Sequence, residues 1–106
     1  MAKYLLKASY TIDGVKGVLK DGGSGRRAAV EETVRGLGGS LESFYFAFGD
    51  TDAYVVVDLP DNVTATAISL VVNAAGGAQV TTVPLMTPEE ADEATKKSVE
   101  YRPPGG

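Results

Sequence analysis

The sequence predicts an α+β domain in which helices lie on one face of a four-stranded antiparallel sheet. Three observations indicate this fold class. The apolar residues repeat with a period that switches between two and about 3.6, which separates strands from helices. Glycine clusters at residues 22–25, 36–39 and 76–77 break the chain between these segments. A short link at residues 49–51 joins two strand patterns, which makes them an antiparallel hairpin.

Residues 3–39 are predicted to form one strand and two helical segments. Residues 3–11 alternate as a strand does, and one side of that strand carries Tyr4, Leu6, Ala8 and Tyr10. Asp13 can cap a short helix that the glycines of residues 22–25 interrupt. A second helical segment follows, with an apolar stripe at i, i+4 and i+7 made of Val30, Val34 and Leu37. The glycines of residues 36–39 are expected to end it.

Residues 40–86 are predicted to form the hairpin, a helix and a fourth strand. The strand at residues 40–48 has Phe44, Phe46 and Phe48 on one face and Leu41, Tyr45 and Ala47 on the other. The valine-rich residues 53–59 form the third strand. Residues 60–62 open a helix, and its predicted buried stripe consists of Ala67, Leu70, Val71 and Ala74. Residues 79–86 form the last strand.

A third helix is predicted close to the C-terminus. Thr87 suits the N-cap, Pro88 suits the first helical position, and Glu90 completes a capping box. The resulting order is βαββαβ plus a terminal helix, which is the ferredoxin-like arrangement. We expect a single domain over residues 1–100 and a tail over residues 101–106.

Both faces of the two hairpin strands carry apolar side chains, although two helices can cover only one face. An uncovered aromatic face would be a large exposed patch, and a second copy packed sheet against sheet would cover it. We therefore expect a homodimer. The alternative is that the terminal helix folds back over this face, with only a thin stripe of Ala91 and Ala94 to bury. The tail is expected either to be disordered or to dock on the partner through Tyr101 and Arg102.

The composition narrows the classes of function. The chain has 106 residues, no histidine and no cysteine, which removes the usual triads and the usual zinc and haem ligands. We expect no cofactor and no metal, since a metal site would need oxygen ligands only. The net charge of −4 argues against nucleic acid as a partner. No apolar stretch approaches the roughly 20 residues that span a bilayer, so we expect no membrane association and a cytoplasmic location.

Two arginines follow the first glycine cluster. Residues 23–28 fit the dinucleotide pattern G-x-G-x-x-A, but that pattern belongs between a strand and a helix of a parallel sheet, and a helical segment precedes it here. Ser24, Arg26 and Arg27 at a helix N-terminus could instead hold a carboxylate or a phosphate. The alternative is that the arginines pair with acidic residues or with a partner chain, the nearby acids being Asp21 and Glu31.

Aspartates and tyrosines supply further candidates. Asp50 and Asp52 flank Thr51 in the hairpin and could serve as general acid and base, although turn chemistry also explains aspartates there. The tyrosines could line a pocket between sheet and helices, or they could belong to core and dimer packing; they are Tyr4, Tyr10, Tyr45 and Tyr54.

Several runs of the chain resemble the GYD domain family and together cover nearly all of it: residues 3–11, 14–17, 22–24, 26–28, 44–52, 59–61 and 96–105. That family carries a Gly-x-Tyr-Asp signature at the position of the hairpin. Gly49 and Asp52 match the signature, and Thr51 stands where the family carries tyrosine. The resemblance implies a dimeric α+β barrel and implies no assigned reaction.

The favoured interpretation is a GYD-like homodimer, or a higher oligomer, with a pocket between sheet and helices for a small anionic or aromatic molecule. The predicted ligand-binding residues are Tyr10, Ser24, Arg26, Arg27, Tyr45, Asp52 and Tyr54. One alternative is a cofactor-independent oxygenase or isomerase, because dimeric α+β barrels host such activities. The other alternative is a structural assembly subunit without a ligand. Binding without catalysis is favoured over the enzyme.

Overall fold

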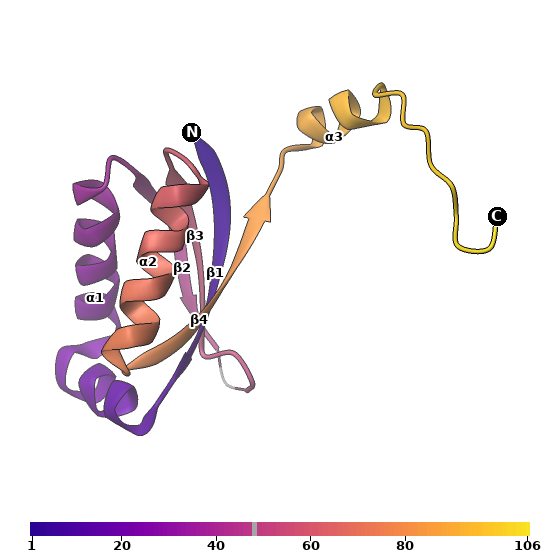
Figure 1. Cartoon of the computed structure of the whole chain (residues 1–106). Helices are drawn as coiled ribbons and strands as arrows, with labels where there is room; N and C mark the ends of the chain where they lie inside the picture. The colour runs from indigo at the N-terminus through magenta and orange to yellow at the C-terminus, as the bar shows by residue number, and fades with distance from the viewer. Residues whose placement is uncertain (48) are drawn as a thin grey trace.

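A computed structural model describes residues 1–47 and 49–106 of the chain (Figure 1). Phe48, which we assigned to the second strand, lies outside the described residues. In chain order the elements are β1 (Ala2–Tyr10), α1 (Ile12–Gly36), β2 (Ser40–Phe46), β3 (Ala53–Leu59), α2 (Asn62–Ala75), β4 (Ala78–Leu85) and α3 (Pro88–Thr95). The predicted order of strands and helices is confirmed.

The four strands form one antiparallel sheet in the order β2-β3-β1-β4. Figure 1 shows α1 and α2 side by side on one face of this sheet. This topology confirms the ferredoxin-like α+β fold. None of the helices in residues 1–47 and 49–106 combines the length and the apolar character that a membrane crossing needs.

The core lies between the helices and one face of the sheet. Because side chains alternate along a strand, Tyr4 and Leu6 of β1 point toward the helices and lie opposite Val57 and Val55 of β3. The buried residues of the core come from both layers: Tyr4, Leu6, Ala53, Val55, Val57 and Leu59 from the sheet, and Val34, Ala65 and Ile68 from the helices. The predicted facing of residues 3–11 is therefore correct.

The helix α1 begins two residues earlier than predicted and is broken where predicted. Thr11, not Asp13, is its N-cap: the Thr11 hydroxyl accepts a hydrogen bond from the Gly14 amide at 3.2 Å. Asp13 lies in the first turn, where its charge suits the helix dipole. The backbone of Gly22 has φ of +76° and ψ of 166°, so the helix stops there and restarts at Gly23. A residue with a Cβ is strained at such a φ, which explains glycine at this position.

The strand β2 departs from simple alternation. Leu41 lies opposite Val57 and Ser43 lies opposite Val56, so Glu42 is the extra residue of a β-bulge. The bulge turns Leu41 to the same side as Phe44, and both pack against the core. The prediction that Leu41 lies on the face opposite the phenylalanines is therefore wrong, because counting alternate residues cannot detect an inserted one.

The helix α2 buries a different stripe from the predicted one. Ala65 and Ile68 are buried and Val72 is partly buried, whereas the predicted residues are exposed. The apolar residues of α2 cover a wide arc that is bounded by a polar stripe of Asn62, Thr66, Ser69 and Asn73, so periodicity alone could not select which part of the arc faces inward. We call the outward-facing apolar residues the α2 stripe; they are Val63, Ala67, Leu70, Val71 and Ala74.

The second face of the sheet is not covered by any described helix. We call it the open face. Its middle row runs across three strands, with Leu5 of β1 between Val56 of β3 and Val83 of β4. Phe44 and Phe46 both point toward the helices, so the apolar part of the open face is narrower than the sequence indicated.

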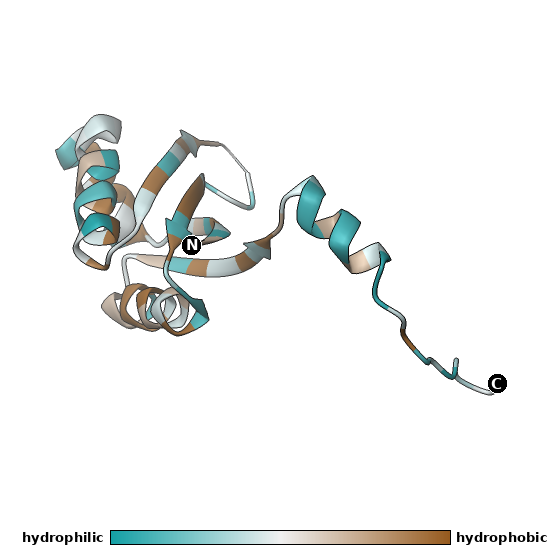
Figure 2. Ribbon diagram, turned by 90° about the horizontal axis from the view of Figure 1, so that it is seen from above, coloured by the Kyte–Doolittle hydropathy of each residue, from teal (hydrophilic) through white to brown (hydrophobic). Residues whose placement is uncertain are grey.

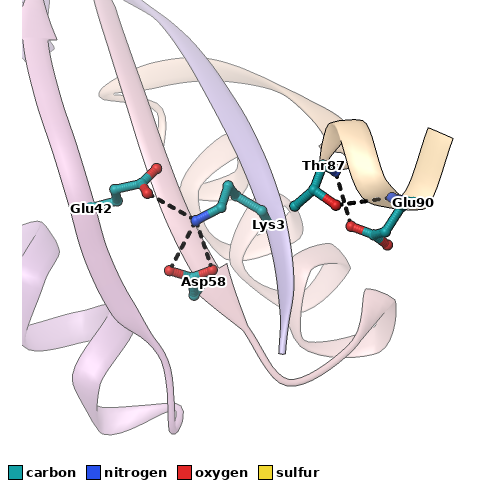
Figure 3. Close-up of polar contacts among 5 residues, drawn as sticks. All are labelled: Lys3, Glu42, Asp58, Thr87 and Glu90. Carbon is teal, nitrogen blue, oxygen red and sulfur yellow. Dashed lines mark hydrogen bonds and ion pairs between the residues drawn. The ribbon is translucent and has the colours of Figure 1, made fainter. Parts of the chain in front are cut away.

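The helix α3 leaves the sheet instead of folding back over the open face. Figures 1 and 2 show α3 and the tail projecting from the domain. Every residue from 86 to 106 is exposed. The predicted capping box is confirmed, because the Thr87 amide donates to Glu90 at 3.0 Å and the Glu90 amide donates to the Thr87 hydroxyl at 3.1 Å (Figure 3).

Two glycines in the first turns of α1 give a matched test of this packing. A Cβ on Gly14 would lie 1.8 Å from the carbonyl oxygen of Gly77, whereas a Cβ on Gly17 would meet nothing within 4 Å. We expect Gly14→Ala to lower the free energy of unfolding by about 1–3 kcal/mol, because the backbone at Gly77 has to move away from the added Cβ. We expect Gly17→Ala to raise it by about 0.5–1 kcal/mol. Urea denaturation measures both, and equal effects would contradict the close approach of Gly14 to Gly77.

Candidate functional site

A cavity of about 190 Å³ lies between α1, α2 and the sheet. We call it the cleft. Its walls come from both helices and its floor from the sheet, and they consist of Leu6, Ala8, Tyr10, Arg26, Ala29, Val30, Thr33, Val34, Phe44, Ala53, Val55, Ile68, Val72, Ala78 and Val80. Protein interiors contain few voids larger than a water molecule. A space of this size between the layers is therefore the first place to look for a ligand.

Three side chains bring polar groups to an otherwise apolar lining: Tyr10, Arg26 and Thr33. The Thr33 hydroxyl is already engaged, because it donates to the Ala29 carbonyl at 3.1 Å. Arg26 also borders a second depression, which adjoins the cleft and is lined by Gly14, Gly17 and Asp21 among others. Arg26 therefore lies where the two spaces meet.

Arg26 is half-buried, and it forms no ion pair within the part of the chain that the structure describes. Glu31, one of the predicted partners, instead pairs with Arg35 at 3.4 Å. Asp21, the other predicted partner, borders the adjoining depression without reaching Arg26. The guanidinium group is thus available to an anion at the edge of an apolar space.

The local backbone explains how Arg26 reaches the cleft. The helix restarts at Gly23, so Arg26 belongs to the second turn of the restarted segment and not to its N-terminus. A Cβ on Gly23 would lie 3.0 Å from the ring of Phe46, which shows how closely the break approaches β2. Ser24 is exposed and does not line the cleft.

Asp52 supports the cleft without lining it. Its carboxylate accepts a hydrogen bond from the Tyr10 amide at 2.8 Å, and its own amide donates to the Ala8 carbonyl at 2.8 Å. These two bonds extend the pairing between the hairpin and β1 beyond the end of the strand ladder. Asp52 therefore fixes the backbone of Tyr10, one of the polar residues of the cleft.

The remaining predicted residues lie elsewhere. Tyr45 and Tyr54 are cross-strand neighbours on the open face, with exposed fractions of 71% and 40%. Arg27 is exposed and borders a separate depression that includes Glu31, Glu42 and Tyr45. Of the seven predicted residues, the structure thus brings only Tyr10 and Arg26 together in the cleft.

Most of the residues that line the cleft were not among the predicted ligand-binding residues. Ala29, Val30 and Thr33 follow Arg26 at spacings of three, four and seven, which places all four on one side of α1. That spacing was visible in the sequence. The α2 side of the cleft, including Val72, could not be identified because apolar residues cover a wide arc of that helix.

The open face holds a charged cluster at one end. The Lys3 ammonium group donates to Glu42 at 3.0 Å and to Asp58 at 3.1 Å, which links β1 to the adjacent strand β3 and, beyond it, to β2 (Figure 3). The hydrogen bond to Glu42, followed by the one to Asp58, raises the pKa of Lys3 above its usual value. Lys7, further along the same face, lies between Tyr54 and Thr81. Two cations and two anions thus share this face.

Comparison with known proteins gives one match. The model of the family described as GYD domain matches residues 4–95. Searches among curated proteins and among solved structures returned no match.

The two hairpin aspartates give a matched test of the support for Tyr10. We expect Asp52→Ala to lower the free energy of unfolding by about 1–2 kcal/mol, because a charge-assisted hydrogen bond to the Tyr10 amide is lost. Asp50 is exposed, and its carbonyl oxygen, which accepts from the Ser9 hydroxyl at 2.6 Å, survives in Asp50→Ala. That variant is expected to change stability by less than about 0.5 kcal/mol. Chemical denaturation measures both, and an Asp52→Ala protein as stable as the parent would refute this role.

Proposed function

The chain belongs to the GYD domain family, and from that premise we propose that it is a homodimeric binding protein with one small anionic ligand in the cleft of each subunit. The observation that carries the proposal is Arg26, a half-buried arginine without an ion pair among the described residues, at the edge of an apolar cavity. Moving a charged group out of water costs free energy unless the charge is paired. An anionic ligand paired with Arg26 would offset the desolvation cost of its half-buried guanidinium group.

The size and lining of the cleft define the class of ligand. An apolar cavity of about 150 Å³ holds a benzene molecule in another protein, and the cleft measures about 190 Å³. One aromatic ring or a branched aliphatic group therefore fits the apolar part. The guanidinium group of arginine binds carboxylates through two parallel hydrogen bonds. A small carboxylic acid with a compact apolar body suits both features.

The open face supports the proposed homodimer. Leu5, Val56 and Val83 form an apolar row across its centre, and the exposed ring of Tyr54 adjoins that row. The charged residues of the face balance, since Lys3 and Lys7 match Glu42 and Asp58 in number. A neutral face with an apolar centre suits self-association about a two-fold axis, because each copy supplies both signs of charge. Two such sheets would pack face to face about 10 Å apart.

Ligand binding can be tested with phenylacetate as the anionic probe and 2-phenylethanol as its neutral analogue. We expect the native chain to bind phenylacetate more tightly than the alcohol. Arg26→Gln should weaken phenylacetate binding by tenfold or more, since a charge-assisted hydrogen bond contributes about 1.5–3 kcal/mol. Arg27→Gln, the matched control at the next position, should bind as the native chain does.

Calorimetric titration gives the affinities, and mass spectrometry of the purified protein identifies any small acid that accompanies it. Equal affinity of the Arg26→Gln and Arg27→Gln variants for phenylacetate would contradict the assignment of Arg26. A native chain that binds neither probe and carries no small molecule would favour a structural assembly subunit.

The interface can be tested by placing a charge at the centre of the open face. We expect Val56→Glu to convert the dimer to a monomer, because the glutamate would be buried against the apolar row of the second copy. Leu19→Glu is the control, since Leu19 of α1 is 81% exposed and lies away from the open face. Light scattering after size exclusion gives the masses, and circular dichroism verifies that both variants fold. A Val56→Glu dimer of unchanged mass would contradict this interface.

A further inference from the structure

The C-terminal arm, residues 86–106, lies within the longest run of the chain in which every residue is exposed. It nevertheless contains a well-capped helix, and the apolar side chains of Met86, Val99 and Tyr101 are exposed by 66%, 76% and 74%. Apolar side chains that remain in water contribute no hydrophobic free energy to folding. The capping box holds the start of α3, while the apolar residues that flank this helix stay exposed within the subunit.

The α2 stripe is the corresponding unsatisfied surface on the body of the molecule. Leu70 and Val71 are 67% and 69% exposed, and α2 carries no charged residue along its whole length. An uncharged apolar helix face suits apolar side chains such as Val99 and Tyr101. Within one chain the two surfaces cannot meet, because the arm projects from the open-face side of the sheet and α2 covers the other side (Figure 1).

Resting on the dimer proposed above, we infer that the C-terminal arm of each subunit crosses the partner and that Val99 and Tyr101 dock on the partner's α2 stripe. The occupant of the stripe is thus a second copy of this chain. The arm already extends on the side where the partner would lie, and its tail turns back at the far end (Figure 1). The arm would then act as a clasp that holds the sheet-to-sheet dimer together.

The dimensions of the arm agree with this path. Two packed sheets lie about 10 Å apart, and a helix layer is about 10–12 Å thick. The outer surface of the partner's helices would therefore lie roughly 20–25 Å from the sheet that sends out the arm. The helix α3, with eight residues, covers about 12 Å. Five non-helical residues between Leu85 and Val99 add about 16 Å, so Val99 can reach that surface.

The absence of cysteine from the sequence allows a direct test by cross-linking. Two full-length variants are made, Val99→Cys and Leu70→Cys, and mixed under conditions that allow subunits to exchange. Copper phenanthroline then serves as the oxidant that joins two thiols in a disulfide. We expect a covalent heterodimer to form at least tenfold faster in this mixture than in a mixture of Val99→Cys with Leu19→Cys, the control on exposed α1.

A second pair of full-length variants measures the energetic role of the arm. We expect Val99→Ser combined with Tyr101→Ser to raise the dissociation constant of the dimer at least tenfold, because two apolar side chains no longer become buried. Glu93→Gln on the acidic side of α3 should leave that constant unchanged.

The outcomes separate the arm from the dimer itself. Selective cross-linking of Val99→Cys to Leu70→Cys, with weaker association of the double serine variant, supports the clasp. A dimer that cross-links no faster than the Leu19→Cys control overturns the clasp and leaves the dimer in place. A native chain that is a monomer overturns both.

Discussion

A four-stranded sheet has two faces, and the helices of this chain cover only one. This imbalance determines much of the structure. Phe44 and Phe46 of β2 point to the helix side, and the β-bulge at Glu42 turns Leu41 to that same side. The open face keeps a short apolar row with charges at one end, a composition between that of a core and that of a solvated surface. The proposed second copy of the chain would complete the layers without any additional element.

The layer of helices is less closely packed than the sheet, because the cleft lies between α1 and α2. The α1 helix is broken at Gly22, and the residues that line the space between α1 and α2 include four alanines, Ala8, Ala29, Ala53 and Ala78. Small side chains at these positions leave volume that longer ones would fill. Arg26 stands at the edge of this volume. The glycine cluster and the arginine after it are thus connected: the break at Gly22 sets where the second segment of α1 begins, and with it the side on which Arg26 emerges.

The fold could be predicted from the sequence where each local signal was unambiguous. Alternation placed Tyr4, Leu6, Ala8 and Tyr10 of β1 on one side, and the capping box at Thr87 located α3. Prediction failed where contacts between distant segments, and not the local pattern, decide which side chains are buried. A bulge shifts the facing of Leu41 without any trace in the pattern, and the wide apolar arc of α2 does not reveal that Ala65 and Ile68 point inward. Of the candidate site, Arg26 and Tyr10 were predictable, whereas Tyr45 and Tyr54 belong to the other face, and the wall that α2 supplies depends on which of its sides is buried.

Sedimentation equilibrium of the native chain over a range of micromolar concentrations tests whether a second copy covers the open face. A second copy over the open face predicts a mass of twice 11.0 kDa that persists as the protein is diluted through this range. A single-chain mass at every concentration would contradict it, because the apolar row of the open face would then be stable in water without a partner.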